Sequence, residues 1–315
     1  LEWYNAIDEL GVSSEEKARF NFQKGYCLFH TGKQAESKPY FESVQNNPLY
    51  ADNAKYYLGY IAYDSDDYAK AESYFREVQD DATLSKNVSY FQANMYFKQA
   101  LYDEAIEEGQ KQLAKTKSAQ EISELNKIIG ESYFNQKKYK EAIPYLQKYK
   151  GKKGKFSNTD YYYLGYAFYK NNDYKAAIEQ FNKIVGGNDN VAQNAYYHLA
   201  ECYLKTYQKQ QALNAFRNAS QMDFDKQIKK DAHLNYARLS YEIGNPYESV
   251  PSVLQAYAQA YPNDNKEEIQ SLLVDSYISS GNYQAAISLL EKSNDPKDKE
   301  TYKKVAFYRG LELFN

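Results

Sequence analysis

Apolar and polar positions between residues 161 and 184 alternate in a way that predicts two amphipathic helices joined by a tight turn. The apolar face of the first helix has the spacing i, i+3, i+4, i+7 and consists of Tyr161, Leu164, Gly165 and Phe168. The polar residues 171–173 interrupt this spacing, and Asp173 is suited to cap a second helix. The second helix has an apolar face with the spacing i, i+4, i+7, formed by Ala177, Phe181 and Ile184.

This two-helix unit recurs along the whole chain. One small or short residue marks each predicted first helix: Gly25, Gly59, Ala93, Gly130, Gly165, Ala200, Ala237, Val274 and Gly310. The successive intervals are 34, 34, 37, 35, 35, 37, 37 and 36 residues, which predicts a repeat array. Twelve residues after each of the first eight markers stands Ala or Ser, and a large residue usually follows four positions later. Small residues at a helix crossing allow close packing, so the marker is predicted to lie where the two helices of one hairpin cross.

The order aromatic-x2-Leu-Gly-x2-aromatic followed by Ala-x3-Phe in residues 161–181 resembles the tetratricopeptide repeat. This resemblance implies an all-α fold, a right-handed α-solenoid of about eight helix-turn-helix hairpins in a single array over 1–315. The predicted hairpins are 15–48, 49–82, 83–119, 120–155, 156–189, 190–225, 226–264 and 265–297. Residues 1–14 and 298–315 are predicted to be partial repeats, which suggests a piece of a longer array; a capping helix at the C-terminus is the alternative.

The composition of the chain disfavours some classes of function but does not identify one. The formal net charge is −3 with 26% charged residues, which favours neither nucleic acid nor an anionic membrane as a partner. No apolar run reaches the roughly 20 residues needed to cross a bilayer. The 36 tyrosines are the unusual feature, and tyrosine suits both half-buried positions and recognition surfaces. Repeats rich in Tyr, Asn and Lys resemble those of bacterial envelope proteins, which implies the periplasm or the outer membrane, with the cytoplasm as the alternative.

The sequence offers no motif for catalysis, for a cofactor or for a metal. His30, His198 and His233 show no metal-ligand spacing, so structural or surface roles are expected for them. Cys27 and Cys202 occupy the same repeat position five repeats apart, so they are not expected to form a disulfide with each other. We therefore expect a protein without enzymatic activity.

The resemblance also implies which residues face a partner. In tetratricopeptide repeats, the positions −3, +1, +4 and +5 relative to the small residue tend to line the concave face. Carried over to this chain, the implied partner-binding residues are Tyr26, Phe29, Tyr56, Tyr60, Tyr63, Tyr90, Asn94, Lys98, Tyr162, Tyr166, Tyr169, Lys170, Tyr197, Arg238 and Tyr241. Several of these aromatic residues are alternatively expected to pack against a neighbouring hairpin.

The predicted function is a non-catalytic protein–protein interaction scaffold. Its concave groove would bind a peptide or helix of a partner protein, with aromatic anchors and mixed charges providing selectivity. A glycan-binding module that stacks sugar rings on the aromatic residues is one alternative. An accessory domain of a larger protein is the other. Fold resemblance alone does not separate these possibilities.

Overall fold

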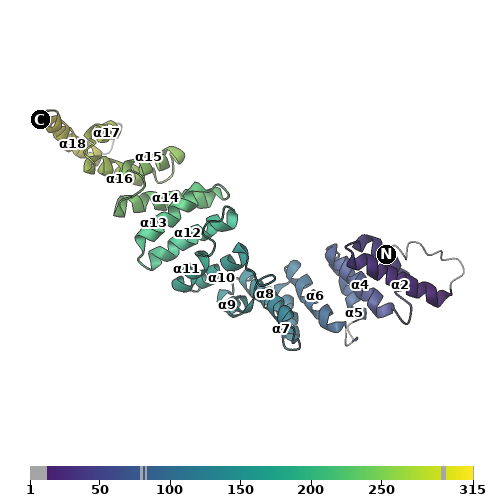
Figure 1. Cartoon of the computed structure of the whole chain (residues 1–315). Coiled ribbons are helices and arrows are strands. Elements are labelled where there is room, and N and C mark those ends of the chain that lie inside the picture. The colour runs from purple at the N-terminus through teal and green to yellow at the C-terminus, as the bar shows by residue number, and fades with distance from the viewer. Residues whose placement is uncertain (1–12, 79–80, 82–83, 292–295, 315) are drawn as a thin grey trace. The chain divides into compact units, whose positions relative to one another are not determined.

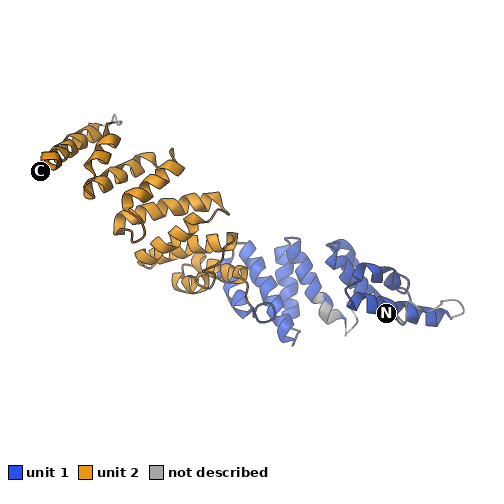
Figure 2. Ribbon diagram, turned by 45° about the horizontal axis from the view of Figure 1, so that its top comes forward, with its two compact units in different colours: residues 1–155 blue, residues 156–315 orange. Residues whose placement is uncertain are grey.

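The computed structural model describes residues 13–78, 81, 84–291 and 296–314. Within these residues the chain is α-helical without β-strands, apart from one isolated bridge between Lys152 and Lys155. The chain divides into two compact units, residues 1–155 and 156–315 (Figure 2). The division falls at the predicted boundary between hairpins four and five. The predicted partial repeat at 1–14 lies almost wholly outside the described residues.

Unit 1 contains four consecutive helical hairpins, coloured purple to blue-green in Figure 1. Their helices are α2 (Ser14–His30), α3 (Gln34–Glu42), α4 (Ala51–Asp64), α5 (Tyr68–Glu77), α6 (Ser85–Lys98), α7 (Tyr102–Leu113), α8 (Ala119–Asn135) and α9 (Tyr139–Lys148). Each predicted hairpin from 15–48 to 120–155 therefore contains one of these helix pairs.

Unit 2 contains four further hairpins and one additional helix (Figure 1). Its helices are α10 (Asn158–Lys170), α11 (Tyr174–Phe181), α12 (Asn190–Lys205), α13 (Lys209–Gln221), α14 (Lys226–Ile243), α15 (Val250–Ala260), α16 (Lys266–Ser279), α17 (Tyr283–Leu290) and α18 (Pro296–Phe314). The predicted all-α array of tetratricopeptide-type hairpins is confirmed.

The turn inside each hairpin contains a residue with a positive φ at the same repeat position. The residue seven positions after each small marker has a positive φ: Gly32, Asp66, Ala100, Lys137, Asn172, Tyr207, Gly244 and Gly281. This left-handed residue ends the first helix and reverses the chain. The second helix then begins two residues later in seven of the eight hairpins. The predicted cap at Asp173 is confirmed, because its carboxylate accepts a hydrogen bond from the Ala176 N–H at 3.1 Å.

Hairpin seven departs from this arrangement. Its second helix, α15, begins only at Val250, and Ser249 caps that helix from outside it. Ser249 is exposed, so it is not the buried small residue that the repeat spacing predicts. The Asn245 side chain holds the longer connection, donating to the Tyr236 hydroxyl at 2.7 Å and accepting from the Tyr247 N–H at 2.8 Å.

The predicted close contact at the small residues is confirmed within the hairpins. A Cβ atom placed on Gly59 would lie 2.6 Å from the Phe75 ring, and one on Gly165 would lie 2.9 Å from the Phe181 ring. Real Cβ atoms do not approach other atoms so closely, so the ring occupies the space that a side chain would need. Each ring belongs to the large residue that stands sixteen positions after its glycine.

Hairpin three lacks this large residue, because Gly109 stands in its place. A side chain of the next hairpin fills the space that the large residue occupies elsewhere. A Cβ on Gly109 would meet the Ile129 side chain of α8 at 2.8 Å, and Ile129 is fully buried. The glycine therefore lets the following helix approach closely.

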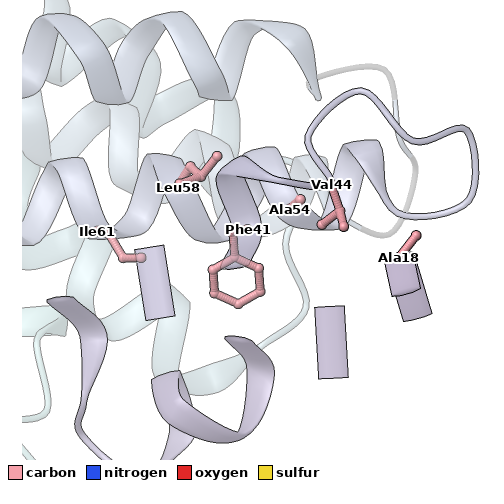
Figure 3. Packing of buried hydrophobic residues seen from close by; sticks show 6 residues of the cluster. All are labelled: Ala18, Phe41, Val44, Ala54, Leu58 and Ile61. Atoms are coloured by element: carbon pink, nitrogen blue, oxygen red, sulfur yellow. The ribbon is translucent and has the colours of Figure 1, made fainter. Parts of the chain in front are cut away.

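Apolar side chains also join each hairpin to its neighbour. Figure 3 shows one such cluster, which combines side chains of α2, α3 and α4 and the residue Val44. Its buried members are Ala18, Phe41, Val44, Ala54, Leu58 and Ile61. Phe41 thus serves two contacts, since it packs against Gly25 within hairpin one and belongs to the cluster that hairpin two completes. Hairpin one is therefore stabilised by hairpin two, as expected for neighbouring units of a repeat array.

We predict that Gly165→Leu lowers the free energy of unfolding by about 1–3 kcal/mol, because the larger side chain must displace Phe181. The measurement is urea denaturation followed by far-UV circular dichroism. Gly310→Leu in α18 is the matched control, because a Cβ at Gly310 meets nothing within 4 Å. Equal destabilisation by the two substitutions would contradict this explanation.

Candidate partner-binding face

The residues at positions −3, +1, +4 and +5 relative to each small residue are here called the first-helix face. Their accessibility separates them into two groups. The side chains at +5 are exposed in all eight hairpins: His30, Asp64, Lys98, Asn135, Lys170, Lys205, Glu242 and Ser279. Most aromatic side chains at −3, +1 and +4 are only half-buried, and Tyr26 and Tyr241 are the exposed exceptions among the predicted tyrosines. The aromatic residues thus form a layer beneath an exposed polar row.

A residue of the next hairpin packs into this aromatic layer. In hairpin two this residue is Tyr57, which lies two positions before Gly59. Its ring centroid is 4.8 Å from that of Phe29 and 5.8 Å from that of Tyr26. Tyr57 also stacks on Phe41, with centroids 4.9 Å apart and an interplanar angle of 14°.

Phe91 occupies the same repeat position in hairpin three, two residues before Ala93. Its ring lies 5.3 Å from Tyr60 and 5.1 Å from Tyr63, both on the first-helix face of hairpin two. It also stacks on Phe75 at 5.5 Å with an interplanar angle of 10°. The aromatic contacts of hairpins one and two are therefore built in the same way.

His198 is the corresponding residue in hairpin six. Its ring centroid lies 4.9 Å from Tyr166, 5.1 Å from Tyr169 and 6.3 Å from Tyr162. It stacks on Phe181 at 6.3 Å, and its Nδ1 atom lies 2.8 Å from a Glu201 carboxylate oxygen. His198 therefore connects the tyrosines of hairpin five to hairpin six.

The residues Tyr57, Phe91 and His198 are here called the −2 residues. They are not among the residues that the family resemblance places on the partner-binding face. A signal was present, because all three are aromatic or heteroaromatic and stand at one repeat position. Their spacing from the marker places them on the side of the first helix that faces the preceding hairpin, and only the packed structure shows that contact.

Lysine ammonium groups lie over this aromatic layer in both units. Lys170 Nζ is 5.1 Å from the ring centroid of Tyr166 and 5.2 Å from that of Tyr169. Lys98 Nζ is 4.9 Å from the ring of Tyr63, and it also lies 3.3 Å from an Asp66 carboxylate oxygen. Such cation–π contacts hold the exposed lysine against the tyrosines.

Several predicted residues lie together in unit 1. Tyr63 donates its hydroxyl proton to Asn94 Oδ1 at 2.8 Å, so hairpins two and three are also joined by a polar contact. Phe29 lies 5.2 Å from Tyr60, Tyr56 packs against Phe75, and Tyr90 packs against Phe91. The Phe29–Tyr60 contact joins hairpins one and two, whereas the Tyr56–Phe75 and Tyr90–Phe91 contacts each lie within one hairpin.

The remaining predicted residues have separate surroundings in unit 2. Arg238 donates two hydrogen bonds to the Glu268 carboxylate, at 2.7 and 2.6 Å, and this pair joins α14 to α16. The paired guanidinium holds the pKa of Glu268 below its usual range. Tyr197 packs against Phe216 and His198, whereas Tyr241 is exposed at the end of α14.

Burial changes the acidity of the tyrosine layer. Removal from water raises the pKa of Tyr57, Tyr63 and Tyr90 to about 12, because a buried phenolate is poorly solvated. The pKa of Tyr169 is also raised, first by burial and then by the nearby Glu201 carboxylate. These hydroxyls are therefore neutral over the physiological range.

The described residues provide no group of three or more His, Cys, Asp or Glu side chains arranged to hold a metal ion. Cys27 is half-buried and Cys202 is buried, and both are free thiols. Burial raises the pKa of the Cys202 thiol to about 12, which disfavours the thiolate. In the described part of the chain, none of the helices combines the length and apolar character needed to cross a membrane.

The hairpin geometry, the repeat spacing and the sequence profiles define the class of protein together. The profile of the family described as "Tetratricopeptide repeat" matches residues 56–120. The profile described as "Anaphase-promoting complex, cyclosome, subunit 3" matches residues 135–219. The two matched segments and the hairpin geometry together support a protein of the tetratricopeptide repeat family.

Solved structures of other repeat proteins are similar to this chain. Pseudomonas aeruginosa pilF has 14% identity, covers 72% of this chain and 98% of its own, and gives a TM-score of 0.49. The C-terminal part of a TPR repeat-containing protein from Cytophaga hutchinsonii has 15% identity, covers 89% and 98%, and gives 0.48. YrrB, described as a TPR protein with an unusual peptide-binding site, has 18% identity, covers 60% and 93%, and gives 0.48. No curated protein sequence matches the chain.

We predict that His198→Ala lowers the free energy of unfolding by about 2 kcal/mol, because it leaves a void among Tyr162, Tyr166 and Tyr169. His198→Phe is the matched control, because Phe91 fills the same repeat position in hairpin three. Urea denaturation measures both variants. Retained stability in His198→Ala would show that the ring does not contribute to packing.

We also predict a loss of stability at alkaline pH. The folded state keeps Tyr57, Tyr63 and Tyr90 protonated up to pH 12, whereas unfolded tyrosine ionises near pH 10. The unfolded state therefore loses protons first, so the contribution of these tyrosines to stability is constant below about pH 10 and falls as the pH rises from about 10 to about 12. Parallel titrations of absorbance at 295 nm and of circular dichroism check this. Tyrosinate formation centred near pH 10 with unchanged helix content would contradict it.

Proposed function

We propose that this protein is a non-catalytic interaction scaffold whose first-helix faces bind a helix or an extended segment of a partner protein. The observation that carries the proposal is the pair of layers on these faces. An exposed polar row lies over tyrosines that the next hairpin already holds in place. Repeat arrays use such aligned faces for binding because successive hairpins present equivalent positions along one side.

The packing supports binding because it reduces the entropy lost on association. Tyr166 contacts Tyr162, His198 and the Lys170 ammonium group, so its ring is already restrained in the free protein. Side chains that are ordered before binding lose less freedom when a partner arrives. Tyrosine also combines a broad apolar surface with a polar hydroxyl, which suits it to protein interfaces.

The exposed +5 residues of unit 2 indicate which chemical groups the proposed partner segment carries. Lys170 and Lys205 stand at the +5 position of successive hairpins, at the C-terminal ends of α10 and α12. Both side chains are exposed. We infer that the partner segment places carboxylates or main-chain carbonyl groups near these lysines and apolar side chains against the tyrosines below.

The glycan-binding alternative has less support from the ring contacts. Stacking on a sugar needs an open aromatic face. The rings of Tyr162 and Tyr166 stack on one another at 5.7 Å, and His198 and Lys170 approach Tyr166 from other directions. Protein binding needs only the edges and hydroxyl groups of this layer together with the exposed lysines.

The experiment is affinity capture from a native extract with the wild-type chain and with a Lys170→Glu/Lys205→Glu variant. Charge reversal is expected to weaken capture of a specific protein about tenfold, because each substitution removes an attraction and adds a repulsion. This variant keeps every aromatic side chain and loses only the contacts of Lys170 with Tyr166 and Tyr169, whereas replacing Tyr162, Tyr166 and Tyr169 would also disturb the packing of His198. Immobilised polysaccharides provide a parallel measurement for the glycan alternative.

Lys175→Glu/Lys226→Glu is the matched control, because both lysines are exposed near helix N-termini outside the first-helix face. Lys170→Gln/Lys205→Gln separates the loss of a contact from the unfavourable placement of an acid at a helix C-terminus. Circular dichroism confirms that each variant is folded. Equal capture by the wild type and both reversal variants would exclude the lysine row from binding. Retention of polysaccharide but of no protein would overturn the proposal.

A further inference from the structure

A run of lysines follows helix α9, in a stretch of the chain that contains no acidic residue. Residues 142–159 include neither Asp nor Glu, and five lysines stand among them: Lys148, Lys150, Lys152, Lys153 and Lys155. The side chains of all five are exposed. Among the residues that the structure describes, none of the five lysines forms an ion pair with an acidic side chain. The chain as a whole has a net charge of −3, so this positive charge is a local feature.

The segment is anchored to α8 at the point where it leaves α9. Tyr149 is buried, and the next residue, Lys150, donates its N–H to Ser123 Oγ of α8 at 2.9 Å. Glu121 and Glu124 are the acidic residues of α8 that stand nearest to Ser123 in the sequence. Both accept hydrogen bonds from glutamine side chains, at 2.5 and 3.0 Å respectively. The start of α8 therefore holds the segment in place without neutralising its lysines.

Residues 152–155 form a tight turn beyond this anchor. Lys153 and Gly154, at the centre of the turn, have φ angles of 53° and 77°. The Lys155 N–H closes the turn by donating to the Lys152 carbonyl oxygen at 3.1 Å. Positive φ at both central residues is typical of a type I′ turn, which favours Asn and Gly at these positions. The presence of a lysine at position 153 is therefore not explained by the conformation of the turn.

The turn also places two like charges opposite each other. Lys152 and Lys155 form an antiparallel bridge. Residues that lie directly opposite in such a bridge have Cβ atoms about 4.5–5.5 Å apart, and like charges in this arrangement are destabilising. These lysines therefore do not stabilise the turn, whereas a bound anionic group would reduce the repulsion between them.

The composition of the turn favours carboxylates of a protein over nucleic acid or lipid as the anionic groups. Residues 150–155 consist of lysine and glycine alone. They provide no arginine for paired hydrogen bonds to phosphate and no aromatic ring for stacking on a base. They also provide no apolar side chain to enter a bilayer, and stable membrane attachment needs such a second signal besides charge. On either side of the turn, Tyr149 is buried and Phe156 stacks on Tyr161 at 5.3 Å.

We propose that residues 150–155, here called the lysine turn, bind an acidic segment of a partner protein. An extended segment places alternate side chains on one side, so carboxylates at alternate positions face Lys152 and Lys155 together. Lys150 and Lys153 add positive charge beside this pair. The lysine turn lies outside the first-helix faces, so this proposal is independent of the function proposed above for those faces.

The probe is a fluorescently labelled synthetic peptide with glutamate at every second position and serine between. Fluorescence anisotropy measures its binding to the full chain at about 0.1 M salt, where charges more than about 10 Å apart are largely screened. We expect saturable binding that weakens as the salt concentration rises. The variant Lys152→Gln/Lys153→Gln/Lys155→Gln is expected to bind at least tenfold more weakly, and a peptide with glutamine for glutamate is expected not to bind. Absence of saturable binding by the wild-type chain would exclude the proposal.

Lys70→Gln/Lys175→Gln/Lys226→Gln is the matched control, because it removes the same charge from exposed lysines on α5, α11 and α14. We expect this control to bind the peptide within about twofold of the wild type, and we expect the same of Lys170→Glu/Lys205→Glu on the first-helix faces. Equal weakening by the control and the turn variant would assign binding to net charge. A loss confined to Lys170→Glu/Lys205→Glu would assign it to the first-helix faces. Either result would contradict a site at the lysine turn.

Two further measurements separate binding from a structural role and from other anionic ligands. The turn variant removes opposed like charges, so its urea denaturation midpoint is expected to stay equal to that of the wild type or to rise. A clear fall in the midpoint would show that the lysines serve the fold instead. Vesicles of phosphatidylcholine and phosphatidylserine in equal parts, and a single-stranded oligothymidine, are tested for binding alongside the peptide. If either binds more tightly than the peptide and loses binding in the turn variant, the turn would be assigned to a lipid surface or to nucleic acid, against the proposal.

Discussion

The close approach of two helices at a small residue is the constraint on which the structure depends. Gly59 and Gly165 have no side chain where they meet the rings of Phe75 and Phe181. That absence lets each ring reach the first helix of its own hairpin and still contribute to the cluster beneath the next one. A glycine in a helix costs about 1 kcal/mol relative to alanine, and the apolar burial that it permits offsets this cost.

The −2 residues convert separate hairpins into an array. Tyr57, Phe91 and His198 each insert into the aromatic layer of the preceding hairpin and stack on its large second-helix residue. Structure and proposed function therefore depend on the same tyrosines. Their buried edges join the repeats, and their remaining surface lies beneath the exposed +5 row. Binding to this face would involve residues whose positions the fold has already determined.

The turn that follows each first helix determines how the small marker residue is covered. In seven of the eight hairpins, the turn after the first helix contains a residue with a positive φ and the second helix begins two residues later. At α18 the marker Gly310 is present but uncovered in the described chain. The same physical rule thus explains the closed hairpins of both units.

The sequence by itself determined the all-α fold and the close contacts at Gly59 and Gly165, because these follow from local periodicity and from the spacing of small and large residues. The family resemblance, in turn, gave only a prediction of which tyrosines lie on one face. Only the tertiary structure decided that Arg238 pairs with Glu268, that Ile129 fills the space at Gly109, and that His198 lies among three tyrosines. It likewise decided that α15 begins late, after Ser249. These contacts join residues of different helices or depend on a loop held by side chains, so periodicity within one helix does not specify them.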